Sequence, residues 1–317
     1  MAPDWSGGSG SWRRQLWPSL LNCFIFFAVY FGSYAIAALL ARPVYAILRQ
    51  CHGRVLGPLS AYILSHSFGR IYGRLHWLAL ALGLFFLLLR CRLCSFRRIA
   101  AAIGKWPKCL RHFFFGFFAT AVALASTVLF REWRWRCDFS LSTLAGAFAG
   151  AAFAAIGEEI VFRGLLLRLL NGIFGWRLSL TIDGLFFAFV HFEKTAMTHI
   201  SGTAPTLADG FRAASDSLMA VCDTFQTIPF LSLFLLGFFL GTLFLASGDL
   251  MAPIGFHGGA AFAMLIFRRA VTVVSSTAVN AKSWLLASPV CPIFLCLLLS
   301  FYFHGNRFAK KTWSMPT

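Results

Sequence analysis

The sequence predicts an all-α fold, a polytopic transmembrane helical bundle of about eight spans. Of its 317 residues, 59% are hydrophobic and only 12% are charged, and the mean hydropathy is +0.74. Soluble domains carry about 25% charged residues. The apolar residues gather in windows of about 18 or more, long enough to cross about 30 Å of hydrocarbon as helix. The chain is therefore expected to be an integral, multi-pass membrane protein.

The expected spans are the most apolar stretches of the chain. They lie near residues 17–41, 75–96, 110–131, 142–162, 178–192, 229–247, 252–267 and 285–303. The fifth and seventh windows are short, and residues 55–68 fit either a re-entrant piece or a loop, so the count is good to about one helix. The sequence holds no soluble stretch long enough for its own core, which predicts a single membrane domain over 1–317.

The formal net charge is +17, and it comes from basic residues in short loops between the apolar spans. A nucleic-acid-binding domain would gather such residues in a stripe on one folded surface. Basic loops beside spans ordinarily set topology and contact anionic headgroups. We therefore expect membrane lipids as partners and no nucleic acid.

The longest polar interruption covers residues 193–228. Within it Leu207, Phe211 and Leu218 recur at helical spacing beside Asp209 and Asp216. The pattern fits an interfacial helix that serves as a lid or substrate gate, and it fits a solvated loop equally well.

Two adjacent carboxylates, Glu158 and Glu159, end the apolar stretch of the fourth span, and Arg163 follows them. A charged residue at mid-bilayer costs at least about 2.5–3.5 kcal/mol, so such groups usually pair or face a polar cavity. On a helix Glu159 and Arg163 are spaced for an ion pair, while Glu158 points about 100° away. We expect a structural pair in Glu159 and Arg163, and in Glu158 a base that takes a proton from water.

Two histidines in later spans complete the cluster. His191 follows Phe187 by one helical turn, so the imidazole and the aromatic ring share a face. Glu158 and His191 each lie about 20 Å along the helix from the connection at 171–177, so they can meet in an antiparallel hairpin. His257 lies only about 8–12 Å from its own turn, and it reaches the others only if their helices project beyond the membrane.

Two aspartates in these spans have simpler explanations. Asp183 lies two turns before His191, where it either orients that imidazole through an intermediate group or marks the interface, and we favour the interface. Asp249 precedes the seventh span, where a carboxylate stabilises a helix N-terminus.

The ordered set resembles the intramembrane CAAX prenyl endopeptidase and bacteriocin-processing (CPBP) family, whose pattern is EExxxR, FxxxH, then HxxxN or HxxxD on successive transmembrane helices. The matching residues are Glu158, Glu159 and Arg163, then Phe187 and His191, then His257. The resemblance covers residues 140–265, which would form the catalytic core.

The resemblance implies hydrolysis of peptide bonds in membrane-associated peptides or proteins, including prenylated CAAX-type substrates. Glu158 and His191 would hold and activate a water, His257 would stabilise the oxyanion, and Glu159 with Arg163 would orient Glu158. If zinc is present, His191, His257 and Glu158 or Glu159 would be its ligands. One Glu and two His form only a partial zinc set, so a metal-free mechanism is equally compatible.

One position departs from the family pattern. The Asn or Asp expected four residues after His257 is Ala261, whose side chain neither ligates a metal nor donates a hydrogen bond. Loss of an oxyanion donor costs on the order of 10²–10³ in rate. The alternative is therefore a catalytically impaired relative that acts as an immunity protein or membrane chaperone. A proton-coupled transporter is disfavoured, because the sequence shows no inverted repeat or broken helix pair.

Overall fold

The computed structural model describes residues 11–51, 68–91, 104–128, 133–135, 140–192, 205–273, 293 and 295–298. The chain divides into two compact units. The first comprises 1–19, 94–188 and 226–317, and the second comprises 20–93 and 189–225. The expected single domain stays a prediction.

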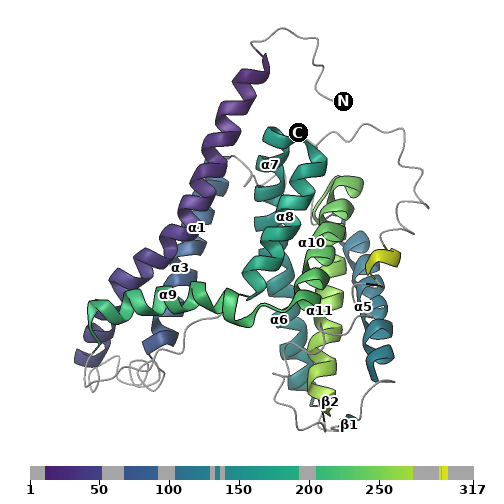
Figure 1. Cartoon of the computed structure of the whole chain (residues 1–317). Coiled ribbons are helices and arrows are strands. Elements are labelled where there is room, and N and C mark those ends of the chain that lie inside the picture. The colour runs from purple at the N-terminus through teal and green to yellow at the C-terminus, as the bar shows by residue number, and fades with distance from the viewer. Residues whose placement is uncertain are drawn as a thin grey trace. The chain divides into compact units, whose positions relative to one another are not determined.

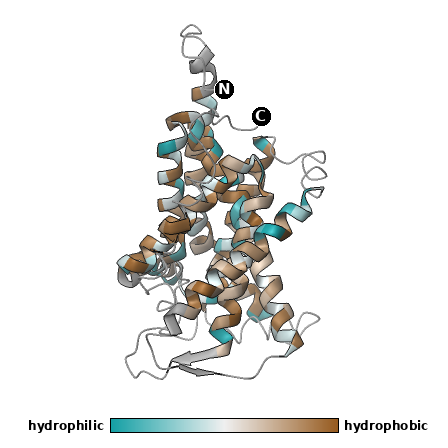
Figure 2. Ribbon diagram, turned by 90° about the vertical axis from the view of Figure 1, so that its right-hand side faces the viewer, coloured by the Kyte–Doolittle hydropathy of each residue, from teal (hydrophilic) through white to brown (hydrophobic). Residues whose placement is uncertain are grey.

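The described helices confirm an all-α membrane protein. Within the described residues, six helical stretches are long and apolar enough to cross a membrane. They are α1 (Ser11–Gln50), α3 (Phe68–Arg90), α5 (Trp106–Val128), the stretch from α6 (Leu141–Glu159) through α7 (Leu167–Phe174), α10 (Thr227–Ser247) and α11 (Met251–Ala270). Apolar residues cover these helices along most of their length (Figure 2). The chain is an integral, multi-pass membrane protein.

Two of the expected spans differ from this set. The fifth corresponds to α8 (Trp176–Phe192), which has 17 residues and is shorter than a typical span. The eighth, near 285–303, lies largely outside the described residues, as does 55–68.

In the first unit, α11 packs against α5, α6 and α10 (Figure 1). Gly255 and Gly259 of α11 lie so close to the Cys109 and Phe113 carbonyl groups of α5 that a Cβ at either glycine would collide with backbone. Glycines at four-residue spacing allow such close approach of membrane helices.

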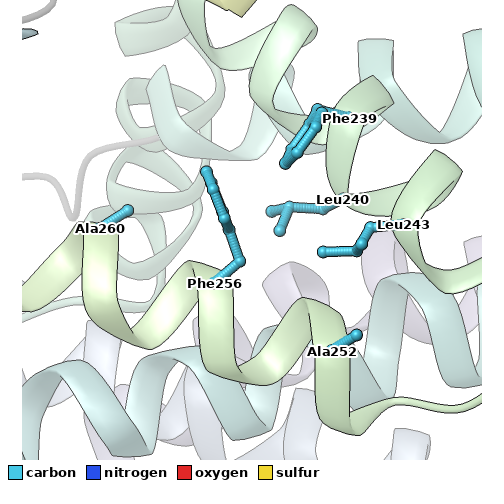
Figure 3. Packing of buried hydrophobic residues seen from close by; sticks show 6 residues of the cluster. All are labelled: Phe239, Leu240, Leu243, Ala252, Phe256 and Ala260. Atoms are coloured by element: carbon cyan, nitrogen blue, oxygen red, sulfur yellow. The ribbon is translucent and has the colours of Figure 1, made fainter. Parts of the chain in front are cut away.

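A buried apolar cluster joins α10 to α11. The cluster residues are Phe239, Leu240, Leu243, Ala252, Phe256 and Ala260 (Figure 3). The rings of Phe239 and Phe256 lie 4.8 Å apart between centroids. Because His257 directly follows Phe256, this packing fixes the turn of α11 that carries the imidazole.

The path from α6 to α8 contains an irregular segment. Ser140 caps α6, since its hydroxyl accepts a hydrogen bond from the Thr143 backbone N–H at 3.1 Å. A π-helix, η1 (Ile160–Leu166), follows α6 without a break and continues into α7. Gly175, with φ of 74°, joins α7 to α8, and only glycine adopts this conformation readily.

Two short strands also belong to the first unit. β1 (Trp133–Trp135) pairs antiparallel with β2 (Val271–Val273), with Trp133 opposite Val273. The pair joins the segment after α5 to the end of α11.

The second unit contains α1, α3 and α9 (Leu207–Thr224). The hydroxyl of Ser33 and Nδ1 of His76 lie 3.0 Å apart and tie α1 to α3. A capping box formed by Thr206 and Asp209 starts α9, which confirms a helix within 193–228. Phe211 and Met219 of α9 are exposed, as expected for an interfacial helix. Its role as a lid or gate stays a prediction.

The turn between α10 and α11 is held by Asp249. Its Oδ1 accepts a hydrogen bond from the Met251 N–H at 3.0 Å, which confirms the expected role at the start of α11. Its Oδ2 pairs with Lys108 at 2.8 Å and Lys105 at 3.2 Å. Burial alone would raise the pKa of Asp249, but the two lysines more than offset it and hold the pKa below its ordinary value of 3.8.

We expect Asp249→Asn to destabilise the protein in a pH-dependent way. A depressed folded pKa means that ionised Asp249 stabilises the fold at neutral pH, and this contribution is lost as pH falls below 3.8. Because Lys105 is half exposed, the loss at neutral pH should not exceed about 1 kcal/mol. Thermal unfolding in detergent at neutral and acid pH measures it. A difference between variant and wild type that does not change with pH would contradict the assignment.

Candidate active site

A buried ion pair forms the centre of the candidate site. Arg163 Nη1 donates to Glu159 Oε1 at 3.0 Å, and both side chains are fully buried. Arg163 Nη2 donates to the backbone oxygen of Gly237 in α10 at 2.7 Å. The pair expected from the four-residue spacing is therefore present, and it also ties η1 to α10.

Asp183 is a third member of this charge cluster, while its expected place at the membrane interface stays a prediction. The side chain is fully buried in α8, and its Oδ2 lies 3.6 Å from Arg163 Nε. The sequence carried a signal for this position. Asp183 precedes Phe187 by one helical turn, so a face assigned to Phe187 also includes Asp183.

Phe187 packs between the guanidinium and an imidazole. Its ring centroid lies 4.8 Å from Arg163 Cζ and 5.9 Å from the centroid of His257. Phe162 contributes a second ring to Arg163, at 5.6 Å. The aromatic faces favour a cation at this place and shield it from competing donors and acceptors.

His257 joins the two carboxylates. Its Nδ1 lies 2.9 Å from Glu159 Oε1, and its Nε2 lies 3.7 Å from Glu158 Oε2. His257 therefore does reach both glutamates. The sequence had made this contact conditional on helices that project beyond the membrane. The carboxylate of Glu159 accepts a hydrogen bond from the Nδ1–H of His257, which directs Nε2 toward Glu158.

The two adjacent glutamates have different surroundings, as expected from their 100° separation on a helix. Glu159 is fully buried, whereas the side chain of Glu158 keeps 32% of its surface exposed. Glu158 is therefore the glutamate that keeps exposed surface, although its Oε2, the oxygen that faces His257, is itself buried, while Glu159 contacts only protein.

Arg163, which contacts several partners, lies in the π-helix η1. In η1 the backbone is wider than an α-helix, and such segments occur often at functional sites. The segment begins directly after Glu159, so the carboxylates end a regular helix and the arginine lies in the irregular one. No feature of the residue pattern predicted this segment.

His191 lies in the last turn of α8, where its side chain is exposed. The residue belongs to the second unit, so its distance from Glu158 and His257 is not part of the described geometry. Its expected part in activating water stays a prediction.

The described side chains offer few metal ligands. Within the described ranges, no group of three or more His, Cys, Asp and Glu side chains is arranged to hold a metal ion. His257 Nε2 and Glu158 Oε2 supply two donors 3.7 Å apart, whereas catalytic zinc takes three protein ligands. Glu159 Oε1 is already engaged by Arg163 and His257. This set alone does not fit a zinc ion.

Ala261 lies one turn after His257 in α11 and is partly buried. Its methyl group offers no hydrogen bond. The position that departs from the family pattern therefore lies one helical turn from His257.

Comparison with known proteins supports the motifs. Residues 140–263 match the family described as type II CAAX prenyl endopeptidase Rce1-like. The match confirms the resemblance, and it begins and ends close to the limits expected from the sequence. Neither the curated proteins nor the solved structures include a match to the chain.

Proposed function

We propose that the protein is an intramembrane endopeptidase that hydrolyses peptide bonds of membrane-associated substrates. One observation carries the proposal. Glu158, whose side chain is partly exposed, places its Oε2 3.7 Å from Nε2 of His257, and the other nitrogen of this imidazole is held by the buried Glu159; all three residues lie within the family match.

The chemistry follows from this arrangement. Glu158 takes a proton from a water molecule, whose oxygen attacks the scissile carbonyl carbon. The carbonyl oxygen gains negative charge, which the imidazolium form of His257 stabilises: its Nδ1–H donates to Glu159 and its Nε2–H donates to the oxyanion. The carbon–nitrogen bond then breaks, and the leaving amine receives the proton from Glu158. In this scheme His191 helps to hold the water.

A prenylated CAAX-type peptide fits this proposal best, because the matching family is described by that substrate. A prenyl chain keeps its peptide at the membrane through burial of apolar groups. The substrate would then reach the site laterally through the lipid.

Cleavage of a farnesylated CAAX peptide by the purified protein in proteoliposomes tests the proposal. Wild type should release the C-terminal tripeptide, while Glu158→Ala and His191→Ala should not. Proteolysis that survives both substitutions would exclude the assigned mechanism.

Ala261 favours one alternative, a catalytically impaired relative. We expect Ala261→Asn to raise kcat by about 10²-fold, because a carboxamide one turn from His257 supplies the missing donor. The peptide assay on wild type and Ala261→Asn measures this. If only the variant cleaves, the natural chain is the impaired relative. If the variant is no faster than wild type, position 261 does not limit the reaction.

Metal dependence is a separate proposal. We expect activity to survive dialysis against a strong chelator, because Arg163 and His257 already occupy Glu159 Oε1. Activity and bound zinc are measured before and after dialysis. Loss of activity that returns only with added zinc would overturn this expectation and make His191, His257 and Glu158 the candidate ligands.

A further inference from the structure

Arg163 is held on three sides by three different helices. Nη1 contacts Glu159 of α6, Nη2 contacts the Gly237 carbonyl of α10, and Nε faces Asp183 of α8. The first two contacts already balance the guanidinium charge and use its outer nitrogens. A second buried carboxylate adds a desolvation cost of its own, so its presence calls for another explanation than charge balance.

The fold brings Asp183 to the arginine by close packing of small residues. A Cβ at Gly237 would lie 3.1 Å from Gly184 Cα, and one at Gly241 would lie 3.9 Å from Asp183 Oδ2. The glycines of α10 therefore let α8 approach. Asp183 faces the cluster because of this contact between two helices.

Asp183 and Arg163 lie close enough for an ion pair but form no hydrogen bond with each other. Among the described residues, both carboxylate oxygens of Asp183 and the Nε of Arg163 are buried without a hydrogen-bond partner. They lie 3.6 Å apart, slightly beyond hydrogen-bond length. A small movement of the guanidinium toward Asp183 would close this bond, and the attraction acts on Nε, a different nitrogen from the Nη1 that donates to Glu159.

The contacts then form a chain that ends at the reacting groups. Asp183 faces Arg163, Arg163 donates to Glu159, and the same Oε1 of Glu159 meets His257 Nδ1. His257 Nε2 in turn faces Glu158. Displacement of the guanidinium would release Glu159, and the imidazole would lose the contact that sets its orientation.

We infer that Asp183 is a positioning residue that, through Arg163 and Glu159, fixes the imidazole of His257 toward Glu158. Its catalytic consequence rests on the proposed peptidase function. Supporting groups of this kind contribute through geometry, since reacting groups must be held within about 0.5 Å of the productive arrangement.

The test compares Asp183→Asn with wild type and with the matched control Ser179→Ala. Ser179 is also fully buried in α8, but its hydroxyl donates to the Gly175 carbonyl, away from the charge cluster. Two readouts are used on the full-length protein in detergent. The first is the rate at which diethyl pyrocarbonate modifies His257, followed by mass spectrometry. The second is kcat and KM on the farnesylated CAAX peptide.

In Asp183→Asn we expect His257 to be modified at least about threefold faster, since it loses its fixed orientation. We expect kcat to fall by about 10–100-fold with KM little changed. Ser179→Ala should match wild type in both. If only thermal stability falls in Asp183→Asn, with kcat and the His257 rate unchanged, Asp183 is structural and the inference is wrong.

The first readout separates this inference from the proposed function. If wild type cleaves no peptide while Asp183→Asn still changes His257 reactivity, the peptidase proposal fails and the positioning role stands. If wild type cleaves the peptide and Asp183→Asn behaves as wild type, the peptidase proposal stands and the positioning role of Asp183 fails. Should Asp183→Asn fail to fold, Asp183→Ser removes the charge without adding volume and is measured in its place.

Discussion

Glu158→Gln is expected to lower kcat on the farnesylated CAAX peptide by about 10²–10⁴-fold, the usual contribution of a general base. Glutamine has the same shape but cannot take a proton from water. Since Glu158 is partly exposed and the buried Glu159 is engaged by Arg163 and His257, no neighbouring group described in the first unit takes over. KM should change little, because the contact that is lost matters mainly in the transition state.

Asp249→Asn is the matched control for this experiment. It makes the same carboxylate-to-amide change at the turn before α11, where Asp249 pairs with Lys105 and Lys108. It should leave kcat within about twofold of wild type, since changes away from the reacting groups have small effects. Equal activity in Glu158→Gln and wild type would remove Glu158 from the mechanism and point to another base.

The sequence alone predicted much of the site because intramembrane charges are expensive. Glu159 and Arg163 had to pair within the bilayer, and their spacing fits one helical turn. The structure shows that pair, and it places His257 beside both glutamates. The family match over residues 140–263 then confirms the family resemblance. The pairing of Glu159 with Arg163 depends on local spacing, which a sequence displays directly, whereas the meeting of His257 with the glutamates depends on the packing of α11 against α6.

Asp183 and the π-helix could not be predicted in the same way. The burial of Asp183 depends on how closely α8 approaches α10, and glycines on both helices decide that distance. A π-helix adds a wider turn without a characteristic composition, so residues 160–166 read as ordinary helix. The burial of Asp183 thus arises from packing between segments that are far apart in the chain.

The largest effect on stability is expected from Arg163→Met. The substitution leaves Glu159 and Asp183 fully buried without their cation and removes the donor to the Gly237 carbonyl. Removal of one partner from a buried ion pair costs about 3–5 kcal/mol, and activity should be lost with the orientation of His257. Unfolding of the purified protein in detergent, measured beside the peptide assay, gives both effects.

Arg177→Met provides the control, because Arg177 is exposed on α8 and packs over the Trp176 ring. It should change stability by no more than about 0.5 kcal/mol. A sharper comparison adds Glu159→Gln and Asp183→Asn to Arg163→Met. If the cost of Arg163→Met comes from two uncompensated carboxylates, the triple variant should recover much of the lost stability. Its activity should stay absent, because the amide of residue 159 no longer holds His257 as a carboxylate does. If the triple variant is as unstable as Arg163→Met alone, the loss comes from the cavity and the freed Gly237 carbonyl, and the carboxylates do not determine stability here.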